Sequence, residues 1–129
     1  MIYNSSGYKV YYYQSSNLKR VPVSEYIQKV SGKEKVKIAA YINFLRGNKG
    51  YINEPYSRYI CSEIRELRVG FSHNKHRIFY TVSGRRKIIL LYAFLKKTQK
   101  TPKKEINHAL NNLQDYKLNK NLVEYEAET

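Results

Sequence analysis

The fold of this chain is decided by residues 64–102, which read IRELRVGFSHNKHRIFYTVSGRRKIILLYAFLKKTQKTP. Apolar and polar residues alternate along 64–71 and 77–82, which predicts strands with one face on a core and the other toward water. Residues 88–95 are apolar almost throughout, as in a central strand that is covered on both faces. Turn-forming residues at 72–75 and 83–84 separate the runs. The stretch therefore predicts a three-stranded antiparallel meander over residues 64–95.

Alternation also predicts which side chains of the second strand are buried. Ile78, Tyr80 and Val82 are expected to pack in the core, and the intervening Arg77, Phe79 and Thr81 to face water. Tyr80 is therefore read as a core residue rather than a catalytic one.

The length of 129 residues favours a single domain. Because 42% of the residues are hydrophobic, as in ordinary globular proteins, the chain is expected to fold. Residues 1–10 lack a signal-peptide pattern and no run of about 18 apolar residues occurs, so a soluble, cytoplasmic protein is expected. The single cysteine, Cys61, excludes an internal disulfide and a cysteine-built zinc site. We expect Cys61 to be a small buried residue.

Positive charge dominates the chain and is unevenly placed. The net charge is +14, and residues 58–104 hold 13 Lys or Arg against 2 Glu. Residues 118–129 hold 1 Lys and 3 Glu, so the tail is acidic. The positive electrostatic field of residues 58–104 attracts phosphate backbones, although an acidic protein partner would also be attracted to it.

Two helices are predicted before the meander. Ser24 resembles an N-cap for a short helix over 25–30, and Ser31 with Glu34 has the spacing of a capping box that starts a second helix. Gly47 is expected to end that helix in a left-handed conformation. The apolar face is expected to comprise Val36, Ala39, Ala40 and Phe44, widened by Ile38, Ile42 and Leu45.

Other elements are predicted at both ends of the chain. Residues 8–13 are rich in strand formers and are expected as an edge or neighbouring strand. Thr101 and Pro102 read as the N-cap and first residue of a last helix. Residues 119–129 could fray, add a strand to the sheet, or fold over the basic surface. In the last case Glu124, Glu126 and Glu128 would shield that surface. The apolar stripe of the last helix is Ile106, Ala109, Leu110, Leu113 and Tyr116.

Three motifs carry a resemblance to a known superfamily: IRELR at 64–68, HRIFY at 76–80 and FLKKTQKTP at 94–102. With them the chain resembles the RelE/ParE toxin superfamily, and within it the HigB-like, phage-derived branch of type II toxin–antitoxin toxins. The resemblance covers about residues 23–116. It implies an α+β fold with an N-terminal strand, a helical hairpin, a twisted antiparallel sheet and a C-terminal helix.

The resemblance also implies an activity. Many members are endoribonucleases, or mRNA interferases, that cut mRNA in the ribosomal decoding site and so inhibit translation. They use no metal or other cofactor, because the RNA 2′-hydroxyl attacks its own neighbouring phosphate. A cognate antitoxin, in this branch similar to a helix-turn-helix DNA-binding protein, holds them inactive.

Such chemistry needs a base, an acid and positive charge around the phosphate. The resemblance assigns the contact with the scissile phosphate to Arg77. Arg68 is expected on the adjacent strand, where both guanidinium groups could meet one phosphate. The alternative for Arg68 is a surface ion pair with Glu66 or with an acidic residue on a neighbouring strand.

The basic loop after the third strand supplies further candidates. Lys96, Lys97 and Lys100 are expected to grip RNA with Thr98 and Gln99, helped by the helix N-terminus that follows. One crowded lysine could have a lowered pKa and transfer a proton. The alternative is a solvated basic loop. Lys75 and His76 are the other RNA-binding candidates, and the turn residue His73 is a weaker acid or base candidate.

Glu66 is the one carboxylate within the basic motifs, so it is either a general base or a structural ion-pair partner. Typical RelE proteins have lysines in this first strand, where this chain has Ile64 and Glu66. We expect no metal site, because no histidines and carboxylates show ligand spacing.

Two other functions keep the same fold. ParE-like relatives inhibit DNA gyrase by binding it, although such a binder does not need arginines and lysines at the strand ends. An inactive module that binds RNA or an antitoxin is the third possibility.

Overall fold

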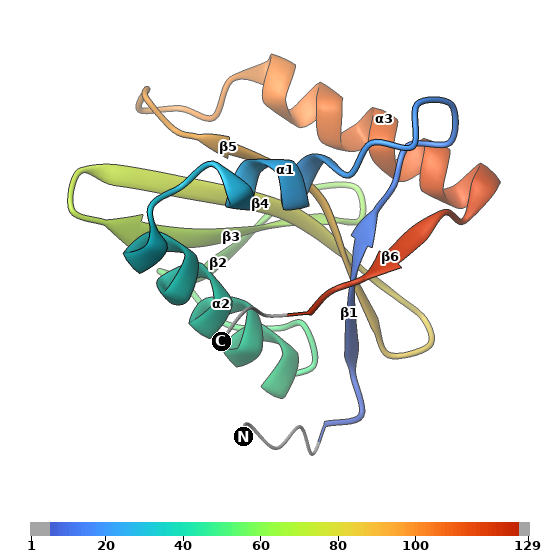
Figure 1. Ribbon diagram of the computed structural model, residues 1–129, viewed down its shortest axis with the longest axis horizontal. Coiled ribbons are helices and arrows are strands. Elements are labelled where there is room, and N and C mark those ends of the chain that lie inside the picture. The colour runs from blue at the N-terminus through green and yellow to red at the C-terminus, as the bar shows by residue number, and fades with distance from the viewer. Residues whose placement is uncertain (1–5, 127–129) are drawn as a thin grey trace.

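The computed structural model describes residues 6–126 and has an α+β fold (Figure 1). Its elements are, in chain order, β1 (Lys9–Tyr13), α1 (Pro22–Gln28), α2 (Gly32–Gly47), β2 (Ser57–Cys61), β3 (Ile64–Phe71), β4 (Asn74–Ser83), β5 (Lys87–Leu95), α3 (Lys103–Asn119) and β6 (Leu122–Glu124). Within these residues, no helix is long and apolar enough to cross a membrane.

The strands form one mixed sheet in the order β2-β3-β4-β5-β1-β6. β3, β4 and β5 pair antiparallel in sequence order, as the alternation predicts. β1 lies parallel to β5, so the N-terminal strand is an inner neighbour and not an edge. β6 pairs antiparallel with β1 and forms the edge of the sheet on this side, so the acidic tail adds a strand. Glu128, one of the three proposed shielding carboxylates, lies outside the described residues.

β2 is a strand that the sequence did not predict. It pairs antiparallel with β3, with Arg58 opposite Glu66, and extends the sheet beyond the meander. Cys61 at its end is partly exposed, so the expectation of a buried cysteine is wrong. The residue ends an edge strand, where one side of the backbone has no neighbouring strand to cover it.

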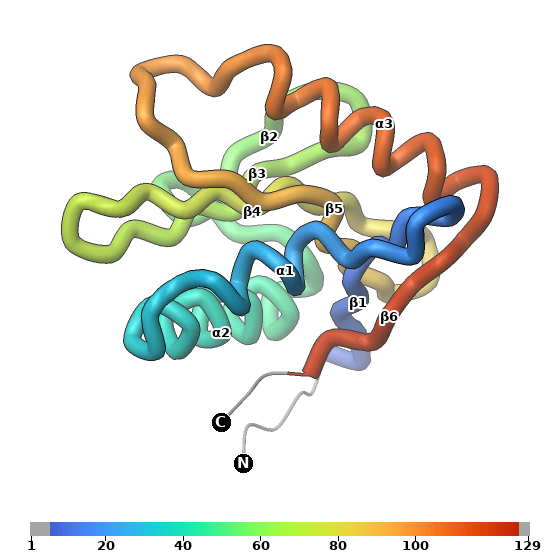
Figure 2. Tube along the Cα trace, turned by 45° about the horizontal axis from the view of Figure 1, so that its top comes forward, coloured from blue at the N-terminus to red at the C-terminus, as the bar shows by residue number. Residues whose placement is uncertain are grey.

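Helices cover both faces of the sheet: α1 and α2 pack on one face and α3 on the other (Figures 1 and 2). Tyr80 lies in the core beneath α1 and α2, as predicted. Arg77, Phe79 and Thr81 were expected to face water, but all three are buried, because α3 packs on this face of the sheet. Val82, expected in the core, is exposed near the end of β4.

The two helices of the hairpin begin differently from one another. Ser31 caps α2 through the predicted capping box, in which its hydroxyl accepts from the Glu34 N–H and the Glu34 carboxylate accepts from Ser31. α1 begins at Pro22, so Ser24 lies inside the helix and the predicted cap is wrong. Proline suits the first helical position, and the Glu25 carboxylate accepts the Val21 N–H over 3.1 Å.

The buried stripe of α2 is narrower than predicted. Ile38, Ile42 and Leu45 are buried at spacings of four and three residues, whereas Val36 and Phe44 are exposed. The wider face is wrong because only one side of the helix touches the sheet. Gly47 is the last helical residue, and the left-handed conformations follow at Lys49 and Gly50 (φ 60° and 82°).

α3 starts one residue later than predicted, with Pro102 rather than Thr101 as its N-cap. The predicted stripe is confirmed: Ala109, Leu113 and Tyr116 are buried against the sheet, and Ile106 and Leu110 pack at its margin. The loop at residues 96–101 before this helix runs from the start of β4, where the Lys96 N–H donates to the Lys75 carbonyl, to Glu66 of β3, which accepts from Thr101.

Candidate functional site

A buried carboxylate lies at the centre of the basic surface. The Glu66 side chain is 0% exposed and shares with Arg68 the sheet face that α3 covers, because alternate residues of a strand point the same way. Arg68 Nε donates to Glu66 Oε1 over 3.0 Å. Arg77 Nε on β4 lies 3.9 Å from the same oxygen. One carboxylate therefore holds two guanidinium groups from adjacent strands. We call Glu66, Arg68, Arg77 and Lys96 the basic cluster.

Arg77 is the most buried cation of the basic cluster, with 9% of the residue exposed. Its Nη1 donates to the His76 carbonyl over 3.1 Å, whereas its Nε makes no hydrogen bond within the described part of the chain. Burial lowers the pKa of Arg77, the Glu66 carboxylate opposes this, and Arg68 lowers it further. A guanidinium nevertheless stays protonated in proteins. Arg77 is thus a buried cation whose Nε is enclosed beside the Glu66 carboxylate, 3.9 Å from Oε1.

Lys96 completes the basic cluster at the end of β5. Its backbone N–H donates to the Lys75 carbonyl over 2.9 Å, which fixes it beside the start of β4. The pKa of Lys96 is lowered by burial first and by the charge of Arg77 next, while the Glu66 carboxylate opposes the shift. Such a lysine gives up its proton more readily than an exposed one.

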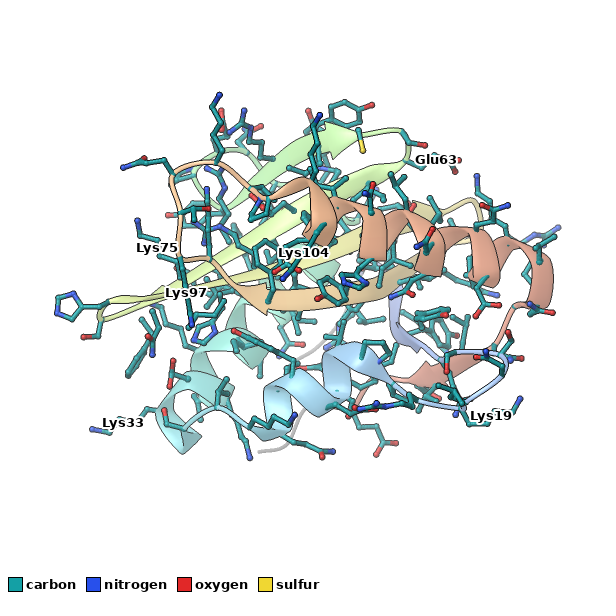
Figure 3. The ribbon with its side chains drawn as sticks, turned by 90° about the horizontal axis from the view of Figure 1, so that it is seen from above. Lys19, Lys33, Glu63, Lys75, Lys97 and Lys104 are labelled. Atoms are coloured by element: carbon teal, nitrogen blue, oxygen red, sulfur yellow. The ribbon has the colours of Figure 1, made fainter. Side chains whose placement is uncertain are left out.

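A hollow adjoins the basic cluster at the open end of the β4–β5 hairpin. Figure 3 shows Lys75 and Lys97 close together at this end, beside the loop that leads into α3. Thr98 shapes that loop, since its hydroxyl donates to the Lys100 carbonyl over 2.6 Å. Lys100 itself is exposed and lies outside the hollow. The lining residues are His73, Asn74, Lys75, Leu95, Lys96, Lys97, Thr98 and Gln99.

His76 is kept out of the site by the strand geometry. Consecutive residues of β4 point to opposite faces, so His76 lies under α1 and α2 and is 2% exposed. Its Nε2 is 2.5 Å from Glu34 Oε2, and its Nδ1 is 2.6 Å from the Tyr26 hydroxyl. The RNA contact predicted for His76 therefore has no basis in this placement. His76 is a buried link between the helical hairpin and β4.

Two residues reach the basic cluster that the sequence did not indicate. The Thr101 hydroxyl donates to Glu66 Oε2 over 3.3 Å, although the sequence assigned it to a helix cap. Glu54 Oε1, from the loop before β2, lies 3.8 Å from Arg68 Nη1. The sequence signal that could have indicated Thr101 is its position directly after the basic segment 96–100, KKTQK. For Glu54 the sequence carries no local signal.

The arrangement suits the binding of a phosphodiester. Guanidinium groups match phosphate geometry, and an amine of lowered pKa beside them can take or give a proton. The Glu66 carboxylate is occupied by Arg68 and Thr101, which favours the structural ion-pair reading over a general base. Among residues 6–126, no three His, Cys, Asp or Glu residues are grouped so as to hold a metal ion.

Comparison with known proteins identifies one family. A family model described as phage derived protein Gp49-like (DUF891) matches residues 25–114, well over half of the chain. The match spans every residue of the basic cluster and of the hollow. No curated protein matches the chain.

Proposed function

The chain belongs to the Gp49-like family of phage-derived, toxin-like proteins, and we propose that it is a type II toxin that cleaves mRNA on the ribosome. The observation that carries this proposal is the basic cluster, in which Arg68, Arg77 and Lys96 converge beside a hollow lined by further lysines. The resemblance to RelE and HigB supports the choice of RNA as the substrate.

The proposed reaction is attack of an RNA 2′-oxygen on the adjacent phosphorus. The 5′-oxygen leaves, and the products are a 2′,3′-cyclic phosphate and a 5′-hydroxyl. Arg77 and Arg68 bind the non-bridging oxygens, where charge develops. Lys96, with its lowered pKa, takes the proton of the 2′-hydroxyl, and the ammonium of Lys97 gives one to the departing oxygen.

The remaining residues position these groups. Glu66 holds Arg68 and Arg77 in place, and Thr101 ties the same carboxylate to the loop before α3. Lys75, Thr98 and Gln99 bind phosphates next to the cleaved one. A cognate helix-turn-helix antitoxin, supplied by a neighbouring gene, would hold the toxin inactive, and the protein would act in the cytoplasm, where ribosomes are.

Cleavage of mRNA on purified ribosomes tests the proposal, with cut sites mapped by primer extension. Arg77→Ala should lower the cleavage rate at least about 100-fold, as loss of one transition-state donor does. Lys96→Ala should also lower the cleavage rate. Arg85→Ala is the matched control, since exposed Arg85 lies in the β4–β5 turn at the far end of the same hairpin. It should cleave like the wild type.

A wild type that leaves mRNA intact on ribosomes would refute the nuclease, as would equal rates in all variants. A supercoiling assay with DNA gyrase then separates the alternatives. Inhibition of gyrase with intact mRNA would select the ParE-like function. Growth unchanged on induction, with neither effect, would select the inactive module.

A further inference from the structure

A groove at the β2 edge of the sheet combines arginines with exposed tyrosines. The loop before β2 supplies Tyr51 and Glu54, β2 supplies Arg58 and Tyr59, and β3 supplies Arg65. Tyr51 is 65% exposed and Tyr59 56% exposed, which is unusual for large aromatic rings. We call this surface the β2 groove.

The guanidinium of Arg65 has two partners within the β2 groove. It lies 4.8 Å from the centre of the Tyr51 ring, and its Nε donates to the Ser57 hydroxyl over 3.3 Å. Ser57 is fully buried and shares a hydrogen bond of 2.8 Å with the Tyr80 hydroxyl, which donates to the Gly50 carbonyl. Arg65, which lies over the Tyr51 ring, is therefore tied to the core through Ser57 and is positioned before a ligand binds.

The β2 groove meets the basic cluster around the β2 edge of the sheet. Ser57, Tyr59 and Arg65 lie on the face that α1 and α2 cover, whereas Arg58 lies on the face of the basic cluster. Arg58 is the β2 residue that pairs across the ladder with Glu66. Glu54, which lines the groove, is 3.8 Å from Arg68 Nη1, so its charge is already partnered. An RNA strand whose phosphate lies on Arg68 thus has a path that passes Arg58 and turns around the β2 edge to Tyr51 and Arg65 on the other face.

We propose that the β2 groove binds nucleotides of the same single-stranded RNA on one side of the cleaved phosphate. This inference deepens the proposed function and rests on it for the position of that phosphate. Bases stack on tyrosine rings and on guanidinium planes, and arginines bind the intervening phosphates. Tyr51 and Arg65 provide the stacking platform, and Arg58 provides the charge nearest to the basic cluster.

The experiment compares two probes by fluorescence anisotropy at low salt: a single-stranded RNA blocked against cleavage by 2′-O-methyl groups, and an abasic strand of equal length. Tyr51→Ala should weaken binding of the intact RNA roughly tenfold, the effect of losing one stacking partner. It should leave binding of the abasic strand unchanged. Arg65→Lys, which keeps the charge but not the plane, should behave in the same way.

Tyr51→Phe, which keeps the ring, and Arg85→Ala, which removes a charge elsewhere, should bind both probes like the wild type. Thermal unfolding of each variant checks that the fold is intact. Unchanged affinity of Tyr51→Ala and Arg65→Lys for intact RNA overturns the proposal, as does an equal loss on both probes. A loss of antitoxin binding with RNA binding unchanged would make the groove a protein interface instead. Because anisotropy needs no cleavage, failure of the groove and failure of the nuclease are distinguishable.

Discussion

Arg68 of β3 and Arg77 of β4 occupy directly paired positions across the antiparallel ladder. Like charges in such a pair destabilise a sheet. The Glu66 carboxylate offsets their repulsion, because its Oε1 is 3.0 Å from Arg68 Nε and 3.9 Å from Arg77 Nε. The fold thus tolerates two adjacent guanidinium groups, and a phosphate that approaches them meets donors already in place.

Glu66→Gln should lower the free energy of unfolding by about 3 kcal/mol, since removal of one partner leaves buried charges uncompensated. Urea denaturation at neutral pH measures the change. The matched control is Glu63→Gln, because Glu63 is exposed and pairs with Lys117 on the surface. That change should cost less than about 1 kcal/mol. Equal costs for the two variants would show that the central carboxylate does not hold the arginines.

Binding of single-stranded RNA should depend on salt through the lysines of the hollow. Lys75→Ala and Lys97→Ala should each reduce the slope of log affinity against log salt by about 0.7, the value for one released counterion on a single strand. Titrations at several salt concentrations measure the slope. Arg85→Ala, with its charge at the other end of the hairpin, should keep the wild-type slope. A slope that changes equally in all three variants would mean that only net charge matters.

The meander was predictable because its signal is local. Alternation of period two fixes which residues of β3 share a face, so the proximity of Glu66 and Arg68 follows from the sequence alone. The pairing of Arg68 with Arg77 follows from a short turn between β3 and β4. Burial of Phe79 could not be predicted in this way, because it depends on where α3 packs.

The rest of the site depends on long-range placement. Thr101 reaches Glu66 only because α3 crosses the sheet and brings the preceding loop over β3. Glu54 reaches Arg68 only because β2 adds to the meander as an unpredicted edge strand. His76 was expected in the site because its neighbours in sequence are basic. Strand alternation instead places its side chain on the other face of the sheet, against Glu34.

The two serines that both resembled helix caps should differ in their effect on stability. Ser31→Ala should lower the free energy of unfolding by about 1 kcal/mol, because Ser31 makes both bonds of a capping box. Ser24→Ala should change it by less than about 0.5 kcal/mol, since Ser24 lies inside α1 and alanine suits a helix interior. Chemical denaturation of both variants measures the two costs. A larger cost for Ser24→Ala would mean that α1 begins later than described.

Acid should weaken the fold through Glu34, which joins α2 to β4. Hydrogen bonds from Asn74, Ser31 and then His76 lower the pKa of Glu34 from 4.5 to about 2. A carboxyl whose pKa is lower in the folded state favours folding while it is charged, so its contribution is complete above about pH 4.5 and is lost as the pH falls toward 2. Urea denaturation across this range should therefore show a steeper loss of stability in the wild type than in Glu34→Gln. Asp115, whose pKa is also lowered, titrates in both proteins, so the difference between them isolates Glu34. Parallel curves would show that Glu34 makes no charge-dependent link to β4.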